Sequence, residues 1–198
     1  TRVLLSDDVP GEPVISEALP LLKLAAPQSI DAQARLARLL IEHPGLDAEA
    51  DPLAMLKSAA ENGSAEGAVF LGRIYLEGQL VPAEPATAEQ WLNRATQTQP
   101  SAHFYLGRLR ERGYDGRSDP QRALQHYLQA ARGGYARADL AIAQMLSKNR
   151  GARIDLVTAY AFARLAERNG VVGSVELLAQ LRTQMDNPQF KRGAELAQ

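Results

Sequence analysis

The chain has 198 residues, no cysteine and a formal net charge of −1, with 22 lysines and arginines against 23 aspartates and glutamates. This balance excludes the basic field that holds nucleic acid, and the lack of cysteine excludes a disulfide framework, a cysteine-ligated metal and a thiol nucleophile in this sequence. Aromatic residues are sparse, at 6%, which suits close contacts between helices better than the core of a β-sheet, so we expect an all-α fold.

The first stretch is predicted to be irregular and to lead into a helix. Residues 1–13 contain two prolines, a glycine and a pair of aspartates, a composition that resists regular structure. Residues 14–26 are strongly apolar, and Pro20 either kinks their helix or places its start near Leu19. This helix is typical of the second half of a helix pair, and because Thr1 is not an initiator methionine, we expect the chain to be a piece of a longer protein.

Four helix pairs are predicted next, followed by a further helix and a terminal one. The pairs cover residues 32–42 with 53–61, 65–76 with 86–96, 102–112 with 121–132, and 136–147 with 156–169. A further helix is expected over 175–182, and residues 188–198 are expected to form a capping helix over the open end of an array that spans 14–187. No run of 18 apolar residues occurs, so no membrane-spanning segment is expected.

Local signals mark the ends of the second helices. Asp51 and Asp119 each precede a proline, and Asp155 precedes an apolar run, so all three are expected to cap a helix N-terminus. Glycines recur where these helices should stop, and each is expected to adopt a left-handed conformation. These glycines are Gly63, Gly134 and Gly170.

Two columns of residues recur with a period of 35 or 36 residues. The small residues Gly72, Gly107 and Ala143 lie on first helices, where they are expected to let the two helices of a pair approach closely. The second column lies between alanines on second helices and is expected to be buried against the next unit. Its members are Trp91, His126 and Phe162. Two columns in step at this period predict a solenoid of helix-turn-helix repeats.

The strings Phe70-Leu71-Gly72 and Phe104-Tyr105-Leu106-Gly107, each followed by glycines and alanines at corresponding positions, resemble the Sel-one-like repeat. That repeat is a relative of the tetratricopeptide repeat, and here the resemblance runs from about residue 31 to residue 179. It implies a right-handed α-solenoid, and the fourth copy departs from it by placing Ala143 where the glycine stands.

The third and fourth copies and the C-terminal stretch also resemble the C-terminal region of the outer-membrane lipoproteins that serve alginate secretion. This resemblance implies a non-enzymatic scaffold in the periplasm, held to the outer membrane by a lipid anchor upstream of this chain. It also implies partner proteins of a secretion complex, among them the alginate acetyltransferase AlgX and the porin AlgE. Direct binding of alginate, a polyuronate, stays open as the alternative.

No combination of residues predicts catalysis, a metal site or a cofactor site. The three histidines are His43, in a turn, His103, at the start of a helix, and His126, expected in the core, and no two of them have the spacing of metal ligands. No nucleophile elbow, phosphate loop or dinucleotide motif occurs. The sequence therefore predicts a protein that is not an enzyme.

One column of polar residues predicts a binding face. It directly follows Ala37 and the small residues Gly72, Gly107 and Ala143, and consists of Arg38, Arg73, Arg108 and Gln144. Moving one residue along a helix turns the side chain by about 100° around the helix axis. This rotation is expected to place the column, together with Tyr105, on the concave face that such arrays use for ligands. The alternative, equally open, is that each arginine pairs with a glutamate about four residues along the helix. Those glutamates include Glu42, Glu77 and Glu111.

Overall fold

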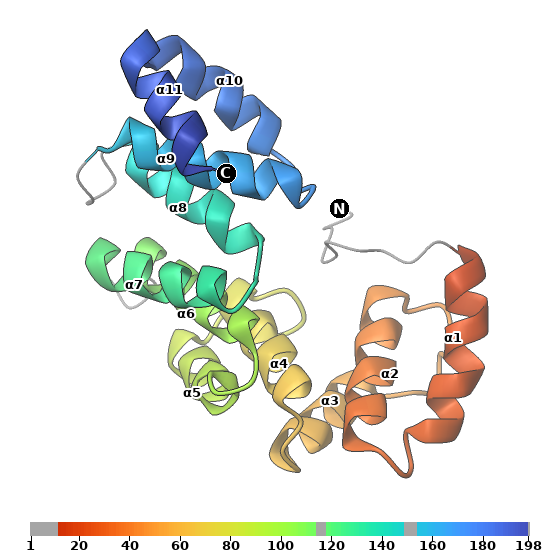
Figure 1. The fold of residues 1–198 in the computed structure, drawn as a ribbon. Helices are drawn as coiled ribbons and strands as arrows, with labels where there is room; N and C mark the ends of the chain where they lie inside the picture. Colours follow the sequence, from red (N-terminus) through yellow and green to blue (C-terminus); the bar gives the residue numbers. More distant parts are fainter. Residues whose placement is uncertain (1–11, 114–117, 149–153, 198) are drawn as a thin grey trace. The chain divides into compact units, whose positions relative to one another are not determined.

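The structure is a computed structural model that describes residues 12–113, 118–148 and 154–197. These residues contain eleven α-helices and no strand (Figure 1). The helices are α1 (Glu12–Ala25), α2 (Ile30–Glu42), α3 (Pro52–Glu61), α4 (Ala65–Glu77), α5 (Pro85–Ala95), α6 (Pro100–Arg112), α7 (Pro120–Arg132), α8 (Arg137–Ser147), α9 (Leu156–Arg168), α10 (Ser174–Gln184) and α11 (Asn187–Leu196). The expected all-α solenoid of helix-pair repeats is confirmed.

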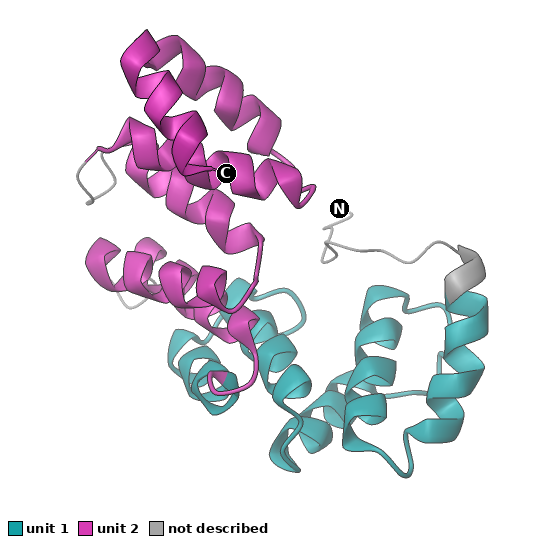
Figure 2. Ribbon diagram, viewed as in Figure 1, with its two compact units in different colours: residues 1–95 teal, residues 96–198 magenta. Residues whose placement is uncertain are grey.

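The helices group into two compact units, which are described separately (Figure 2). The first unit, Thr1–Ala95, holds α1 to α5, and the second, Thr96–Gln198, holds α6 to α11. Within them α2 packs on α3, α4 on α5, α6 on α7 and α8 on α9, so the four predicted pairs are all present. The described part begins at α1, which runs through Pro20 without a break, and residues 1–11 of the expected irregular entry lie outside it.

The residues predicted to cap the N-termini of helices form the expected hydrogen bonds. The carboxylates of Asp51, Asp119 and Asp155 each accept a hydrogen bond of 3.0 Å from a backbone N–H three residues later. Two serine caps were not anticipated: Ser29 accepts from Ala32 N–H and Ser64 accepts from Gly67 N–H, so α2 begins two residues earlier than predicted. Side-chain caps of this kind satisfy backbone donors that a helix leaves unpaired.

The predicted stop signals are also confirmed. Gly63, Gly134 and Gly170 have φ angles of +100°, +85° and +70°, a region that residues with a Cβ enter only with strain. Each follows the last turn of a second helix, so the left-handed residue ends α3, α7 and α9.

The small residues of the repeat let the two helices of each pair approach closely. A Cβ added to Gly72 would lie 2.7 Å from Leu92 Cγ, and one added to Gly107 would lie 2.6 Å from Tyr127 Cε1. Both distances are too short for any real carbon pair, so α5 and α7 lie almost against the backbone of α4 and α6. In the next pair, α8 with α9, the positions one period further along the sequence hold Ala143 and Ala163, and both are fully buried.

The expectation that Trp91, His126 and Phe162 form the buried column is wrong. All three are only partly buried, whereas the residues one position later, Leu92 and Tyr127, fill the contact with the glycines. One residue along a helix is about 100° of rotation, which is enough to move a side chain from the core to its edge. Trp91 accordingly lies at the surface with the guanidinium of Arg94 4.3 Å from its ring centroid.

The terminal helix α11 packs on α9. Its N-terminus has a capping box in which the Asp186 side chain accepts from Gln189 N–H and the Gln189 side chain accepts from Asp186 N–H. Gly193 lies against the ring of Tyr160, and the ring of Phe190 meets that of Tyr160 edge-on at 5.3 Å between centroids. The predicted terminal helix is therefore present and contributes a glycine contact of the kind found within the repeats.

Candidate functional site

In the first unit, the guanidinium groups of two predicted binding arginines lie close to one aromatic ring. The guanidinium carbon of Arg38, from α2, is 5.6 Å from the ring centroid of Phe70, and that of Arg73, from α4, is 5.3 Å from it. Cations over an aromatic face are attracted by its negative charge density. Arg38 belongs to one repeat and Arg73 to the next, so Phe70 and its two arginines join the two repeats.

Each of these arginines also has a carboxylate four residues along its own helix. Arg38 Nε lies 3.0 Å from Glu42 Oε1, and Arg73 Nε lies 3.6 Å from Glu77 Oε2. Only 9% of the Arg73 side chain is exposed, so its expected position on an open face is wrong, and its neighbours include Phe70 and Glu77. Arg38, at 36% exposure, still offers part of its surface to solvent.

In the second unit, the predicted face is also largely occupied by internal contacts. Glu111 Oε2 accepts a hydrogen bond of 2.7 Å from the hydroxyl of the buried Tyr127. Burial, together with the charge of Glu111, raises the pKa of Tyr127 well above its ordinary value. Tyr105 is buried, Arg108 is partly buried and Gln144 is exposed. The structure therefore brings Arg38 and Arg73 together at Phe70, and it brings Glu111 into contact with Tyr127. Of the seven residues predicted to form the binding face, only Gln144 is exposed.

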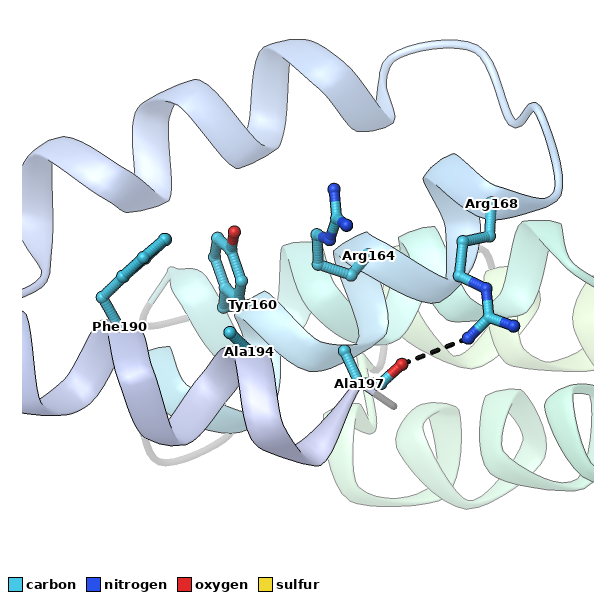
Figure 3. Close-up of a pocket in the computed structure, with 6 residues that line it drawn as sticks. All are labelled: Tyr160, Arg164, Arg168, Phe190, Ala194 and Ala197. Carbon is cyan, nitrogen blue, oxygen red and sulfur yellow. Dashed lines mark hydrogen bonds between the residues drawn. The ribbon is translucent and has the colours of Figure 1, made fainter.

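A cavity that the sequence did not predict lies between α9 and α11 (Figure 3). It has a volume of about 560 Å³ and is lined by Tyr160, Arg164, Arg168, Phe190, Ala194 and Ala197. Tyr160, Arg164 and Arg168 recur every fourth residue of α9, which places them on one face of that helix. That spacing was readable in the sequence, but nothing local indicated that α11 would lie beside this face.

Two of the histidines meet between α6 and α7. The Nδ1 atoms of His103 and His126 are 3.2 Å apart, a hydrogen-bond distance that requires one ring to donate and the other to accept. Burial lowers the pKa of both, and the charge of His103 lowers that of His126 further. Among the described residues, no group of three histidines, aspartates or glutamates is arranged to hold a metal ion.

The repeat signature matches a known family over more than half of the chain. The sequence profile of the Sel1 repeat matches residues 30–64, 65–97 and 100–135. This chain belongs to the Sel1 repeat family. The three matched segments correspond to the pairs α2 with α3, α4 with α5, and α6 with α7, so the glycine contacts described above lie inside Sel1 repeats.

The Sel1 chain is also similar to three curated proteins of one name, the alginate biosynthesis protein AlgK. Identity is 44% over 65% of the chain for the protein of Azotobacter vinelandii, 37% over 92% for that of Pseudomonas syringae pv. tomato, and 35% over 98% for that of Pseudomonas aeruginosa. The matches cover 28%, 39% and 41% of those proteins, so the chain spans less than half of their length. In the part of the chain that the structure describes, no helix is both long and apolar enough to cross a membrane.

Solved structures of Sel1 proteins share this fold. A Sel1 repeat protein from Oxalobacter formigenes is 25% identical, with a TM-score of 0.73 over 92% of this chain and 78% of its own. A second Sel1 repeat protein, from Klebsiella pneumoniae, is 20% identical, with a TM-score of 0.55 over 84% of this chain and 85% of its own. The fold of the chain is thus that of a Sel1 solenoid.

The histidine pair is expected to make the stability of the chain depend on pH. The ordinary pKa of histidine is 6.5, and the folded state holds both values lower, so as the pH falls below 6.5 the unfolded chain takes up protons first. We expect the free energy of unfolding to decrease as the pH falls through this window. Replacing both His103 and His126 with glutamine should flatten the decrease, as measured by urea unfolding at several pH values between about 5 and 8.

A buried carboxylate acts in the opposite direction and must be separated from this effect. Burial raises the pKa of Asp139 to about 6, so the stability that its protonated form contributes is lost as the pH rises from 3.8 to about 6. The histidine variants should therefore also be compared in an Asp139→Asn background. If the slope below pH 6.5 persists there without the two histidines, the pair is not its source.

The two arginines at Phe70 should differ in their effect on stability. Arg73→Gln removes a buried charge partner of Glu77 and is expected to lower the free energy of unfolding by about 1 kcal/mol or more, since removing a charged partner costs more when its surroundings are buried. Arg38→Gln is expected to cost less than Arg73→Gln, because Arg38 itself is 36% exposed, although its partner Glu42 is 9% exposed. Urea unfolding of the two variants measures the difference, and equal costs would contradict the burial of Arg73.

Proposed function

We propose that this chain is a non-enzymatic docking segment for proteins of an alginate biosynthesis and secretion assembly. The observation that carries the proposal is the similarity to AlgK over 98% of the chain in a fold made of Sel1 repeats, which are protein-interaction modules. By the same resemblance, the longer protein would lie in the periplasm, held at the outer membrane by an N-terminal lipid anchor. The partners it implies are the acetyltransferase AlgX and the porin AlgE.

The surface of the repeats supports a docking role. Arg38, Phe70 and Arg73 hold two repeats together, so the helices that display the outer surface form a stable support. Large apolar side chains are exposed near helix ends, where they do not contribute to the core. They are Leu80, Ile154, Val172 and Val175. Burying an apolar side chain of this kind against a partner is favourable, so each of them is a candidate contact for a partner protein.

Binding to purified partners tests the proposal. We would immobilise the chain and measure binding of purified AlgX and AlgE, with the Sel1 repeat protein of Oxalobacter formigenes as a control of matched fold. We expect at least one of the two to bind the chain and not the control. Binding to neither protein, or equal binding to the control, would reject the docking role.

Salt separates docking from direct binding of the polysaccharide. An interface with an apolar centre should weaken only moderately between low and high salt, whereas binding of a polyanion to arginines should weaken steeply. Alginate oligosaccharides measured on the same surface provide the comparison. Steeply salt-dependent binding of the oligosaccharide, without binding of either protein, would favour the polyuronate alternative.

A further inference from the structure

We propose that the cavity between α9 and α11 binds a segment of a partner protein that carries a carboxylate next to an apolar side chain. This proposal rests on the docking role above and gives that role a site and a ligand chemistry. Figure 3 shows the side chains of Tyr160 and Arg164 projecting from α9 on the same side, with Ala194 of α11 and Ala197, which follows α11, beside them. The volume of about 560 Å³ is within the range of pockets that hold small ligands.

Tyr160 is one of the residues that could contact a ligand in the cavity. Only 8% of Tyr160 is exposed, and it lies in the wall of the cavity. Its hydroxyl can both donate and accept a hydrogen bond. A ligand oxygen in the cavity would accept the hydrogen bond from this hydroxyl.

Two guanidinium groups lie one and two helical turns from that hydroxyl. Arg164 forms an ion pair with Glu167 and leaves 43% of its side chain exposed, so most of its five donor hydrogens remain available. Arg168 donates from Nη1 to the backbone oxygen of Ala197 at 3.2 Å, which fixes its head group at the end of α11. Arginine binds carboxylates through two parallel hydrogen bonds, so the donors on this face of α9 match a carboxylate.

The remaining lining favours a protein segment over a polyuronate. The guanidinium of Arg182 lies 4.4 Å from the centroid of the Phe190 ring and covers part of that ring. The edge-on contact between Phe190 and Tyr160 covers a further part. A sugar ring that stacks on an aromatic needs an open face, and its hydroxyls need acceptors as well as donors. The arginines and Tyr160 supply hydrogen-bond donors, which suit a carboxylate. Ala194 and Ala197 supply methyl groups, which suit an apolar side chain beside that carboxylate.

Small capped peptides test the site without knowledge of the partner. The complete 198-residue chain would be titrated with the capped tripeptide Leu-Asp-Leu and with its uncharged analogue Leu-Asn-Leu, and followed by nuclear magnetic resonance of the backbone amides and arginine side chains. We expect Leu-Asp-Leu to shift signals of α9 and α11 and to bind at least about tenfold more tightly than Leu-Asn-Leu. An oligomer of mannuronate forms the third arm of the titration.

Two conservative variants and one control locate the binding. Arg164→Gln and Tyr160→Phe should each weaken binding of Leu-Asp-Leu several-fold while leaving the melting temperature nearly unchanged, because neither removes apolar packing. Arg122→Gln is the matched control, since Arg122 forms an exposed ion pair with Asp119 three residues away on α7 and should bind as the wild type does.

Each other outcome overturns the proposal. Equal affinity for Leu-Asp-Leu and Leu-Asn-Leu, or shifts away from α9 and α11, would show that the cavity does not select a carboxylate. Binding of the mannuronate oligomer in place of the peptide, lost in Arg164→Gln, would assign the cavity to the polysaccharide. Neither result would by itself remove the docking role, which depends on binding of AlgX or AlgE to the whole chain.

Discussion

Replacing Gly107 with leucine is expected to lower the free energy of unfolding by about 3 kcal/mol, the upper end of the usual cost of overpacking, because α6 has no room for any side chain at this position. Even a single Cβ would lie 2.6 Å from Cε1 and 2.7 Å from Cδ1 of Tyr127. The Tyr127 ring cannot move aside easily, since it is 1% exposed, its hydroxyl donates to Glu111, and Phe104 packs on it at 5.6 Å between centroids. Urea unfolding followed by circular dichroism measures the loss.

Alanine at the same position provides a sharper test, because its effect should change sign with its neighbour. In the wild type, Gly107→Ala gains about 1 kcal/mol of helix propensity but introduces the clash, so we expect net destabilisation. In a Tyr127→Ala background the clash is gone, and Gly107→Ala should stabilise. The double variant would then have alanine at both positions, as the next repeat has at the corresponding buried positions Ala143 and Ala163.

Gly45→Ala is the control for this series. No heavy atom lies within 4 Å of a Cβ built at Gly45, and its φ is not in the left-handed region, so stability should stay within about 0.5 kcal/mol of the wild type. If Gly107→Ala were as harmless as Gly45→Ala, the close approach of α6 and α7 would be wrong.

Leu92→Ala is expected to destabilise the chain by about 2–5 kcal/mol, more than the truncation of the larger Trp91 beside it. Leu92 is fully buried, and its side chain lies over Gly72, so its removal leaves a cavity between α4 and α5. Trp91 is partly exposed and packs under Arg94, so Trp91→Ala should cost only about 1 kcal/mol.

The two neighbouring variants can be compared in one set of urea titrations. Trp91 is the only tryptophan in the chain, so unfolding of both variants is best followed by circular dichroism rather than by fluorescence. A larger loss for Trp91→Ala than for Leu92→Ala would mean that α5 is rotated by about one residue from its described orientation.

The sequence by itself determined the features that depend on the residue type at one position and on residues close to it along the chain. Asp51, Asp119 and Asp155 cap their helices because an acceptor side chain reaches the N–H three residues later. Gly63 and its counterparts end helices because only glycine enters the left-handed region without strain. The recurrence of Gly72 and Gly107 fixed the repeat and the family, because close helix contacts at a constant period need small residues in one column.

Only the tertiary structure decided which side of each helix is buried. The alternation of alanines around Trp91 and His126 was compatible with either rotation, and the choice of Leu92 and Tyr127 depends on where the partner glycine lies in three dimensions. The burial of Arg73 likewise follows from the packing of α2 on α4. The cavity beside Tyr160 needs α11 to lie on α9, a contact between segments about thirty residues apart that no local pattern specifies.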